Sequence, residues 1–79
     1  MNRLAVIIPT LDEEAHISTL LDALHEQQGV TLEIIVADGG SRDGTTRAVA
    51  AHGPATLIES ACGRGAQMNA GRAATNAPW

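Results

Sequence analysis

Apolar positions along the chain occur both as unbroken runs and as spaced stripes, which predicts strands and helices in turn. Leu4–Thr10 and Thr31–Asp38 are runs of strand length, and their continuous apolarity is typical of parallel strands buried on both faces. Between them, apolar residues recur at spacings of three and four, which predicts an amphipathic helix that ends near Gly29. These residues are Ile17, Leu20, Leu21 and Leu24.

Residue types also mark where the helices begin. Thr10 and Glu13 have the spacing of a capping box at the start of the first helix. A second helix is predicted over residues 41–53, with Ser41 or Asp43 as its N-cap and a glycine as its stop.

The remainder of the chain continues the alternation. Ala55–Ser60 predicts a short third strand, and residues 63–75 predict a loop that leads into a third helix. The fold class is therefore α/β, a Rossmann-like βαβαβα arrangement of three mostly parallel strands flanked by helices, in one partial domain over residues 1–79. Such an incomplete sheet leaves a long apolar edge uncovered, so we expect a partner chain or a C-terminal continuation to cover it.

Composition and charge narrow the range of functions. The 79 residues suffice for one small domain, and the 44% of hydrophobic residues is typical of a globular chain. The net charge of −4 argues against a nucleic-acid partner, because no basic stripe is present. No apolar run approaches the roughly 20 residues that cross a bilayer, and acids interrupt the N-terminal segment in a way that does not fit a signal peptide. With Cys62 as its one cysteine, the chain is expected in the cytoplasm.

Three loops follow the predicted strands, and in an open parallel sheet ligands bind where such loops meet. Pro9 ends the first strand and could expose backbone groups to a flat ring such as a nucleobase, although helix capping alone also explains Thr10 and Glu13. Asp38 ends the second strand, where it is either a turn residue or an acceptor for a base N–H or a ribose hydroxyl. The two glycines after it favour close approach of a ligand to the backbone.

Other polar side chains are weaker candidates. Arg64 lies in a glycine-flanked loop after the third strand, where its guanidinium is either solvated or bound to a phosphate. Asp43 is expected to be structural, since a metal site would need a second acid nearby. Gln67 and Asn69 could bind a ligand, but their spacing of two places them on different sides of a helix. The histidines lack ligand spacing and are expected at the surface, and Cys62 has no paired histidine motif.

Two other α/β folds are excluded by their motifs. A dinucleotide-binding fold needs G-x-G-x-x-G in its first turn. Residues 9–14 of this chain, which follow the first strand, read PTLDEE instead, and their acids would repel a phosphate. A phosphoacceptor receiver fold needs an aspartate after its third strand, where this chain has Glu59 and Ser60.

Three segments together resemble the start of family 2 of the inverting glycosyltransferases, which have the GT-A fold. "VIIPTLDEE" is similar to that family's V-I-I-P-x-x-N-E, "EIIVADGGSRDGT" to E-I-I-V-V-D-D-G-S-x-D-G-T, and "GRGAQMNAG" to G-x-x-x-A-x-N-x-G. Their order and spacing are also those of the family, and together they span nearly all of the chain. The paired glycines and the third segment look closest to the branch of arsenosugar-biosynthesis-type transferases.

This resemblance implies a nucleotide-diphosphate sugar donor, with a UDP-sugar expected. Asp12 replaces the family's usual asparagine. Gly39 replaces the second acid of the Asp-Asp pair, so recognition of the base must pass to Asp38 or to the backbone. Seven positions match the donor-nucleotide site: Pro9, Leu11 and Glu13 beside the base and ribose, Ala37, Asp38 and Gly39 along the base, and Arg64 near the phosphates.

The resemblance also implies chemistry that this chain does not contain. An inverting transfer requires a base to deprotonate the acceptor hydroxyl and a divalent cation, Mn²⁺ or Mg²⁺, to stabilise the departing diphosphate. The family's D-x-D metal motif and its catalytic base both follow the part matched here, so no catalytic or metal-binding residue is assigned. We expect this chain alone to be catalytically inactive. The alternatives are a stand-alone nucleotide-binding module and a structural α/β module.

Overall fold

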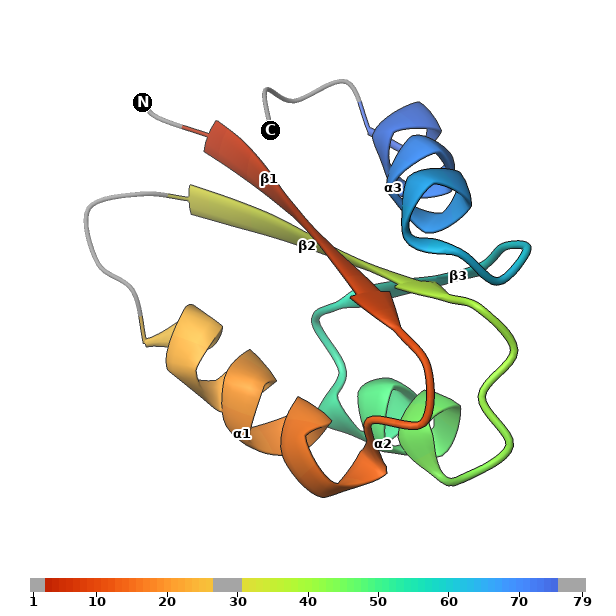
Figure 1. Cartoon of the computed structure of the whole chain (residues 1–79). Helices are drawn as coiled ribbons and strands as arrows, with labels where there is room; N and C mark the ends of the chain where they lie inside the picture. Colours follow the sequence, from red (N-terminus) through yellow and green to blue (C-terminus); the bar gives the residue numbers. More distant parts are fainter. Residues whose placement is uncertain (1–2, 27–30, 76–79) are drawn as a thin grey trace.

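The computed structural model describes residues 3–26 and 31–75, in which strands and helices alternate as predicted (Figure 1). The third strand is shorter than the predicted run Ala55–Ser60, and Gly29, the predicted stop of the first helix, lies outside the described residues. The elements are β1 (Arg3–Thr10), α1 (Glu14–His25), β2 (Thr31–Asp38), α2 (Thr45–His52), β3 (Thr56–Glu59) and α3 (Arg64–Ala73).

The three strands form one parallel sheet in the order β1-β2-β3. Its register places Thr10 opposite Asp38, and Asp38 opposite Glu59. The carboxyl ends of all three strands therefore reach the same edge, which we call the carboxyl edge. The predicted α/β class with parallel strands is confirmed.

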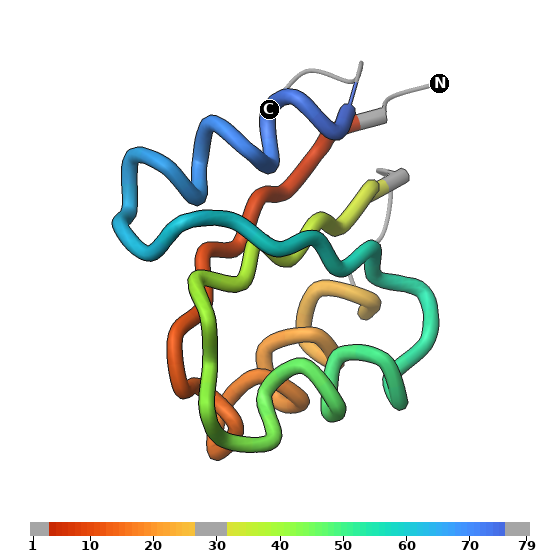
Figure 2. The backbone as a smooth tube through the Cα atoms, turned by 90° about the vertical axis from the view of Figure 1, so that its right-hand side faces the viewer, coloured from red at the N-terminus to blue at the C-terminus, as the bar shows by residue number. Residues whose placement is uncertain are grey.

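Helices cover both faces of this sheet. α1 and α2 lie on one face, and α3 lies on the opposite face over β1 and β2 (Figures 1 and 2). Side chains alternate along a strand, so Ile34 and Val36 of β2 pack towards α1 and α2, while Ile35 and Ala37 face α3. All four side chains are at most 3% exposed. β2 is thus buried on both faces, as its unbroken apolar run predicts.

The core between the sheet and α1–α2 is entirely aliphatic. Within the predicted stripe of α1, Leu24 is half-buried at the margin of this core and Leu20 is 43% exposed. Leu20 stays exposed because it faces the outer side of β1, where no further strand among the described residues covers it. The fully buried members of the core are Ile17, Leu21, Ile34, Val36 and Val49.

A glycine sets the close packing of α3 on β1. Gly71 is buried, and a Cβ atom added to it would lie 2.3 Å from the Cγ2 atom of Ile7. No real Cβ atom tolerates that separation, so the absence of a side chain lets the helix approach the strand. The buried glycine in the last part of α3 thus has a packing role.

The predicted capping box at the start of α1 is wrong. The residue before the helix is Glu13, whose side chain makes no capping hydrogen bond. The hydroxyl of Thr10 instead donates to the carboxylate of Asp38, which lies beside it across the parallel register. The N–H groups at the start of α1 are satisfied by the loop before α2 and by the first residue of that helix. Glu13 N donates to Thr45 Oγ1 (2.8 Å) and Glu14 N to Asp43 Oδ2 (3.2 Å).

α2 begins at Thr45, four residues after the predicted start of the second helix at Ser41. Asp43, one of the two predicted caps, accepts the backbone N–H of Thr45 at 2.9 Å and also its hydroxyl. Ser41 is not a cap, because its hydroxyl and N–H donate to Asp38. Gly53 ends the helix with φ of 100°, as predicted for a glycine stop.

The ends of α1 and α2 are joined by polar side chains. His52 Nε2 lies 2.7 Å from Asp22 Oδ1, and the ring of His25 stacks on that of His52 with centroids 4.7 Å apart. His16 and His25 are exposed, as predicted, whereas His52 is half-buried. This histidine therefore departs from the expected surface position because it fills the space between the two helices.

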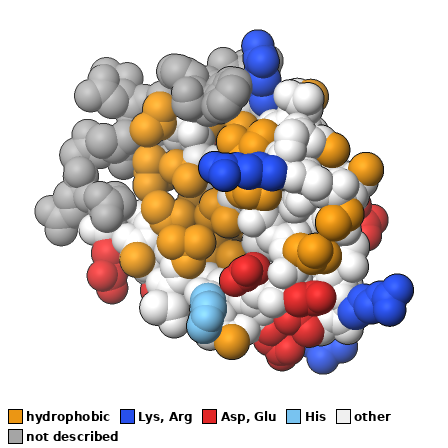
Figure 3. Space-filling view, viewed as in Figure 1, with side chains coloured by type: hydrophobic (Ala, Val, Ile, Leu, Met, Phe, Trp, Pro, Cys, Tyr) orange, Lys and Arg blue, Asp and Glu red, His pale blue; other side chains and the backbone are white. Residues whose placement is uncertain are grey.

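The outer side of β1 carries exposed apolar side chains. In the stretches that the structure describes, no strand pairs with β1 on the side away from β2. Leu4 is 41% exposed, and apolar side chains gather beside α1 in this view (Figure 3). No helix within residues 3–26 and 31–75 combines the length and the apolarity that a membrane crossing requires.

Candidate functional site

The carboxyl edge is organised by the buried carboxylate of Asp38. Asp38 is 1% exposed, and its oxygens accept four hydrogen bonds. The donors are the hydroxyls of Thr10 (2.8 Å) and Ser41 (2.5 Å) and the backbone N–H groups of Ser41 (2.8 Å) and Gly40 (3.1 Å). One carboxylate thus holds the end of β1 and the loop after β2 in a single arrangement.

These contacts set the ionisation of Asp38. Burial raises its pKa, but the hydrogen bonds from Ser41, Thr10 and Gly40 favour the charged form and together outweigh burial. The pKa of Asp38 therefore lies below its ordinary value of 3.8, and the carboxylate is ionised at neutral pH.

Asp12 links the same two loops from the other side. Its N–H donates to Ser41 Oγ (2.9 Å), and its Oδ1 accepts the N–H of Arg42 (2.8 Å). Asp12 has φ of 54°, a backbone conformation that aspartate and asparagine tolerate better than other residues with side chains. Asparagine, which the family pattern has here, carries the same Oδ1 acceptor, so the exchange preserves this contact.

A third set of contacts ties the start of α1 to the loop before α2. The N–H of Gly44 donates to Glu14 Oε1 (3.0 Å), and the N–H of Glu14 donates in the opposite direction to Asp43. The hydroxyl of Thr45 lowers the pKa of Asp43 and keeps that carboxylate ionised. Asp43 therefore joins the start of α1 to the start of α2, which is the structural role predicted from the sequence.

Gln67 is a buried polar residue whose structural role was not predicted from the sequence. It is 4% exposed, and its Nε2 donates to the carbonyl oxygens of Thr10 (2.9 Å) and Ala37 (2.8 Å). Its Oε1 accepts the N–H of Gly63 at 3.2 Å. Gln67 thereby joins the ends of β1 and β2 to the loop before α3. Asn69, by contrast, is exposed, which agrees with the prediction that the two residues lie on different sides of the helix.

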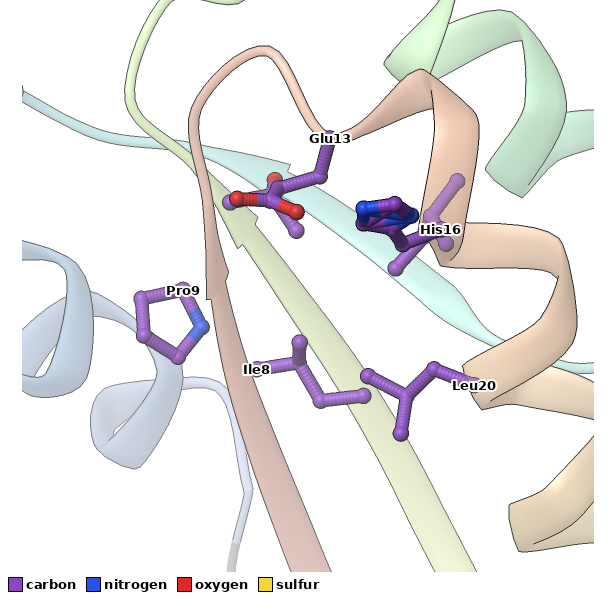
Figure 4. A pocket seen from close by; sticks show the side chains of 7 residues that line it. Ile8, Pro9, Glu13, His16 and Leu20 are labelled. Atoms are coloured by element: carbon purple, nitrogen blue, oxygen red, sulfur yellow. The ribbon is translucent and has the colours of Figure 1, made fainter.

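A shallow pocket of roughly 90 Å³ lies between the end of β1 and the start of α1. Figure 4 shows Glu13 and His16 together at the start of α1, with Ile8 and Leu20 facing one another below them. His16 was predicted only as a surface residue. It follows Glu13, the residue before α1, by three positions, which brings both side chains to the same side at the start of the helix. The lining residues are Ile8, Pro9, Thr10, Glu13, His16, Ile17 and Leu20.

The seven predicted donor-site residues divide by exposure. Pro9 and Glu13 meet in the pocket, whereas Leu11, 44% exposed, is not among its lining residues. Arg64 is exposed as the first residue of α3. The remaining three are buried at the end of β2 and its loop and offer backbone rather than accessible side chains. They are Ala37, Asp38 and Gly39.

The described residues do not fit a divalent cation by themselves. Across residues 3–26 and 31–75, no group of three or more His, Cys, Asp or Glu side chains could hold a metal ion. Cys62 is a free, exposed thiol. No step of a reaction is therefore assigned to a metal ion in this part of the molecule.

Comparison with solved structures places this framework among glycosyltransferases. The chain is similar to glucosyl-3-phosphoglycerate synthase from Mycobacterium tuberculosis in complex with UDP, with TM-score 0.82 and 29% identity over 96% of this chain and 31% of that chain. A second structure of that enzyme, with Mn²⁺, UDP and glucosyl-3-phosphoglycerate, gives the same TM-score and identity, and a third, with phosphoglyceric acid, gives TM-score 0.63 and 34% identity over 73% of this chain. The chain spans less than a third of the length of these proteins.

A search of curated proteins found no match. The family model for glycosyl transferase family 2 matches residues 5–79, nearly the whole chain. The match agrees with the three motifs and with the parallel sheet, while the finer resemblance to the arsenosugar branch stays a prediction. The chain belongs to glycosyl transferase family 2.

Proposed function

We propose that this chain is the donor-nucleotide part of a family 2 glycosyltransferase and binds the nucleotide of a UDP-sugar at the carboxyl edge. The observation that carries the proposal is the framework of buried hydrogen bonds around Asp38 and Gln67, which fixes three strand-end loops relative to one another. Such pre-organisation lowers the ordering cost of binding. The UDP-bound structures of a similar enzyme support the choice of nucleotide.

Each donor-site residue whose side chain is at least partly accessible has a role in this proposal. Pro9 and Leu11 offer apolar surface to the base and ribose, and the Glu13 carboxylate accepts a ribose hydroxyl. The guanidinium of Arg64 donates to the diphosphate, which it can do with two parallel hydrogen bonds.

The buried residues shape the edge against which the base would lie. Ala37, Asp38 and Gly39 follow this edge, and their backbone is held in place because the Ala37 carbonyl accepts from Gln67 and the Gly39 N–H donates to the Thr10 carbonyl. Because the Asp38 carboxylate is engaged by Thr10, Gly40 and Ser41, we assign it to holding this loop.

Transfer of the sugar to an acceptor hydroxyl belongs to the whole enzyme in this proposal. A divalent cation would neutralise the departing diphosphate there. Its ligands and the catalytic base lie outside the residues described here, so we expect this partial domain to bind without transferring. The same proposal places the protein in the cytoplasm, where nucleotide sugars are available to it.

Arg64→Gln tests the phosphate contact. We expect this variant to weaken UDP binding about tenfold or more, because it removes a charge-assisted contact, and to leave uridine binding within about twofold. Isothermal titration calorimetry with UDP and with uridine measures both affinities.

The matched control is Arg47→Gln, which removes an exposed arginine from α2 and should leave both affinities unchanged. A chain that binds neither UDP nor uridine, with or without Mn²⁺, would support the structural α/β alternative. Equal loss of UDP and uridine affinity in Arg64→Gln would remove Arg64 from the phosphate site.

A further inference from the structure

We propose that Gln67 is a positioning residue that holds Arg64 in place for the donor diphosphate. The inference rests on the proposed function and deepens it. Gln67 is buried and does not need to touch the nucleotide, since its three side-chain hydrogen bonds go to Thr10, Ala37 and Gly63. Gly63 directly precedes Arg64, so the bond to Gly63 fixes the backbone from which the guanidinium extends.

The bonding pattern requires an amide side chain. Nε2 supplies two N–H donors to carbonyls of two different strands, at Thr10 (2.9 Å) and Ala37 (2.8 Å), while Oε1 accepts from Gly63. Glutamate has no such donors and would place a charge against two carbonyl oxygens, and methionine fills similar space without any of the three bonds. Gln67 therefore connects the part of the edge assigned to the base with the part assigned to the phosphates.

Gly39 leaves the space that Gln67 occupies. A Cβ atom at position 39 would lie 2.9 Å from the Cδ atom of Gln67 and 3.2 Å from the Cα atom of Cys62. A larger residue at position 39 is thus incompatible with this placement of Gln67. The glycine at position 39 and the buried amide of Gln67 are therefore two parts of one arrangement.

The test is a double-mutant cycle between Gln67→Met and Arg64→Gln, read as the ratio of UDP to uridine affinity. If Gln67 acts through Arg64, Gln67→Met lowers the ratio about tenfold, and the double variant lowers it no further than Arg64→Gln alone. A purely structural role would change both affinities together and leave the ratio as in the wild type.

Several outcomes would overturn the inference while leaving the proposed function standing. An unchanged ratio in Gln67→Met is one, and additive losses in the double variant are another. If Gln67→Met does not fold, Gly63→Ala displaces the same loop, because Gly63 has φ of 133°. That variant should lower the ratio, and an unchanged ratio would reject the inference. Failure of the wild-type chain to bind UDP would instead count against the proposed function itself.

Discussion

Replacing Asp38 with alanine is expected to lower the free energy of unfolding by about 3 kcal/mol, because it leaves one buried and several partly buried donors without their acceptor. The affected donors belong to Thr10, Gly40 and Ser41. A loss of this size is a large fraction of the roughly 5–15 kcal/mol that typically stabilises a folded domain. Urea denaturation followed by circular dichroism measures it.

Glu59→Ala is the matched control, since Glu59 lies opposite Asp38 in the register but is exposed. We expect it to change stability by less than about 0.5 kcal/mol. Similar losses of unfolding free energy in the two variants would show that the hydrogen bonds to the Asp38 carboxylate do not stabilise the fold more than an exposed side chain does.

The same carboxylate predicts how stability depends on pH. The pKa of Asp38 is lowered in the folded chain, so its contribution is complete above the unfolded pKa and is lost as pH falls through the folded pKa. Unfolding free energies between pH 7 and pH 3 should therefore fall towards acid in the wild type. Asp38→Asn should flatten part of this slope, with Asp43, whose pKa is also lowered, responsible for a further part.

Replacing Gly71 with alanine is expected to cost about 2 kcal/mol. The new methyl group would overlap Ile7, which must leave its position or push α3 away from β1, and overpacking of this kind costs roughly 1–3 kcal/mol. The better helix propensity of alanine offsets about 1 kcal/mol at most. Urea denaturation of the variant gives the net effect.

Gly65→Ala provides the comparison within the same helix. Nothing lies within 4 Å of a Cβ atom at Gly65, so alanine there should leave stability unchanged or raise it by up to about 1 kcal/mol. If the two variants had the same effect, the close approach of α3 to β1 would not depend on Gly71.

The sequence predicted the order of the elements because each hydrophobic pattern reflects where the element lies. An unbroken run such as Thr31–Asp38 suits a strand covered on both faces, and the structure covers β2 on both faces. The stripe that contains Ile17 and Leu21 likewise suits a helix with one buried side. The resulting parallel sheet also fixed which loops meet at the carboxyl edge.

The partners of the polar side chains could not be predicted in the same way. Thr10 and Asp38 are 28 positions apart, and Gln67 and Thr10 are 57 apart, so their contacts depend on the register of the finished sheet. Local spacing favoured a capping role for Thr10, but its hydroxyl donates instead to the buried carboxylate of Asp38 on the neighbouring strand. For Gln67, the sequence offers one signal, the glycine at position 39, which leaves room for the buried amide. That signal can be interpreted only when the structure shows that the two residues are in contact.

The position of α3 has a consequence for the direction in which the sheet is wound. α1 and α2 lie on one face and carry the chain from β1 through β2 to β3, whereas α3 lies on the other face. Because crossovers are right-handed, a strand entered from α3 would pair with the free side of β1 rather than with β3. The winding would then reverse at β1, and open α/β sheets bind their ligands at such a reversal. The end of β1, with Pro9 and Glu13, is where that crevice would open.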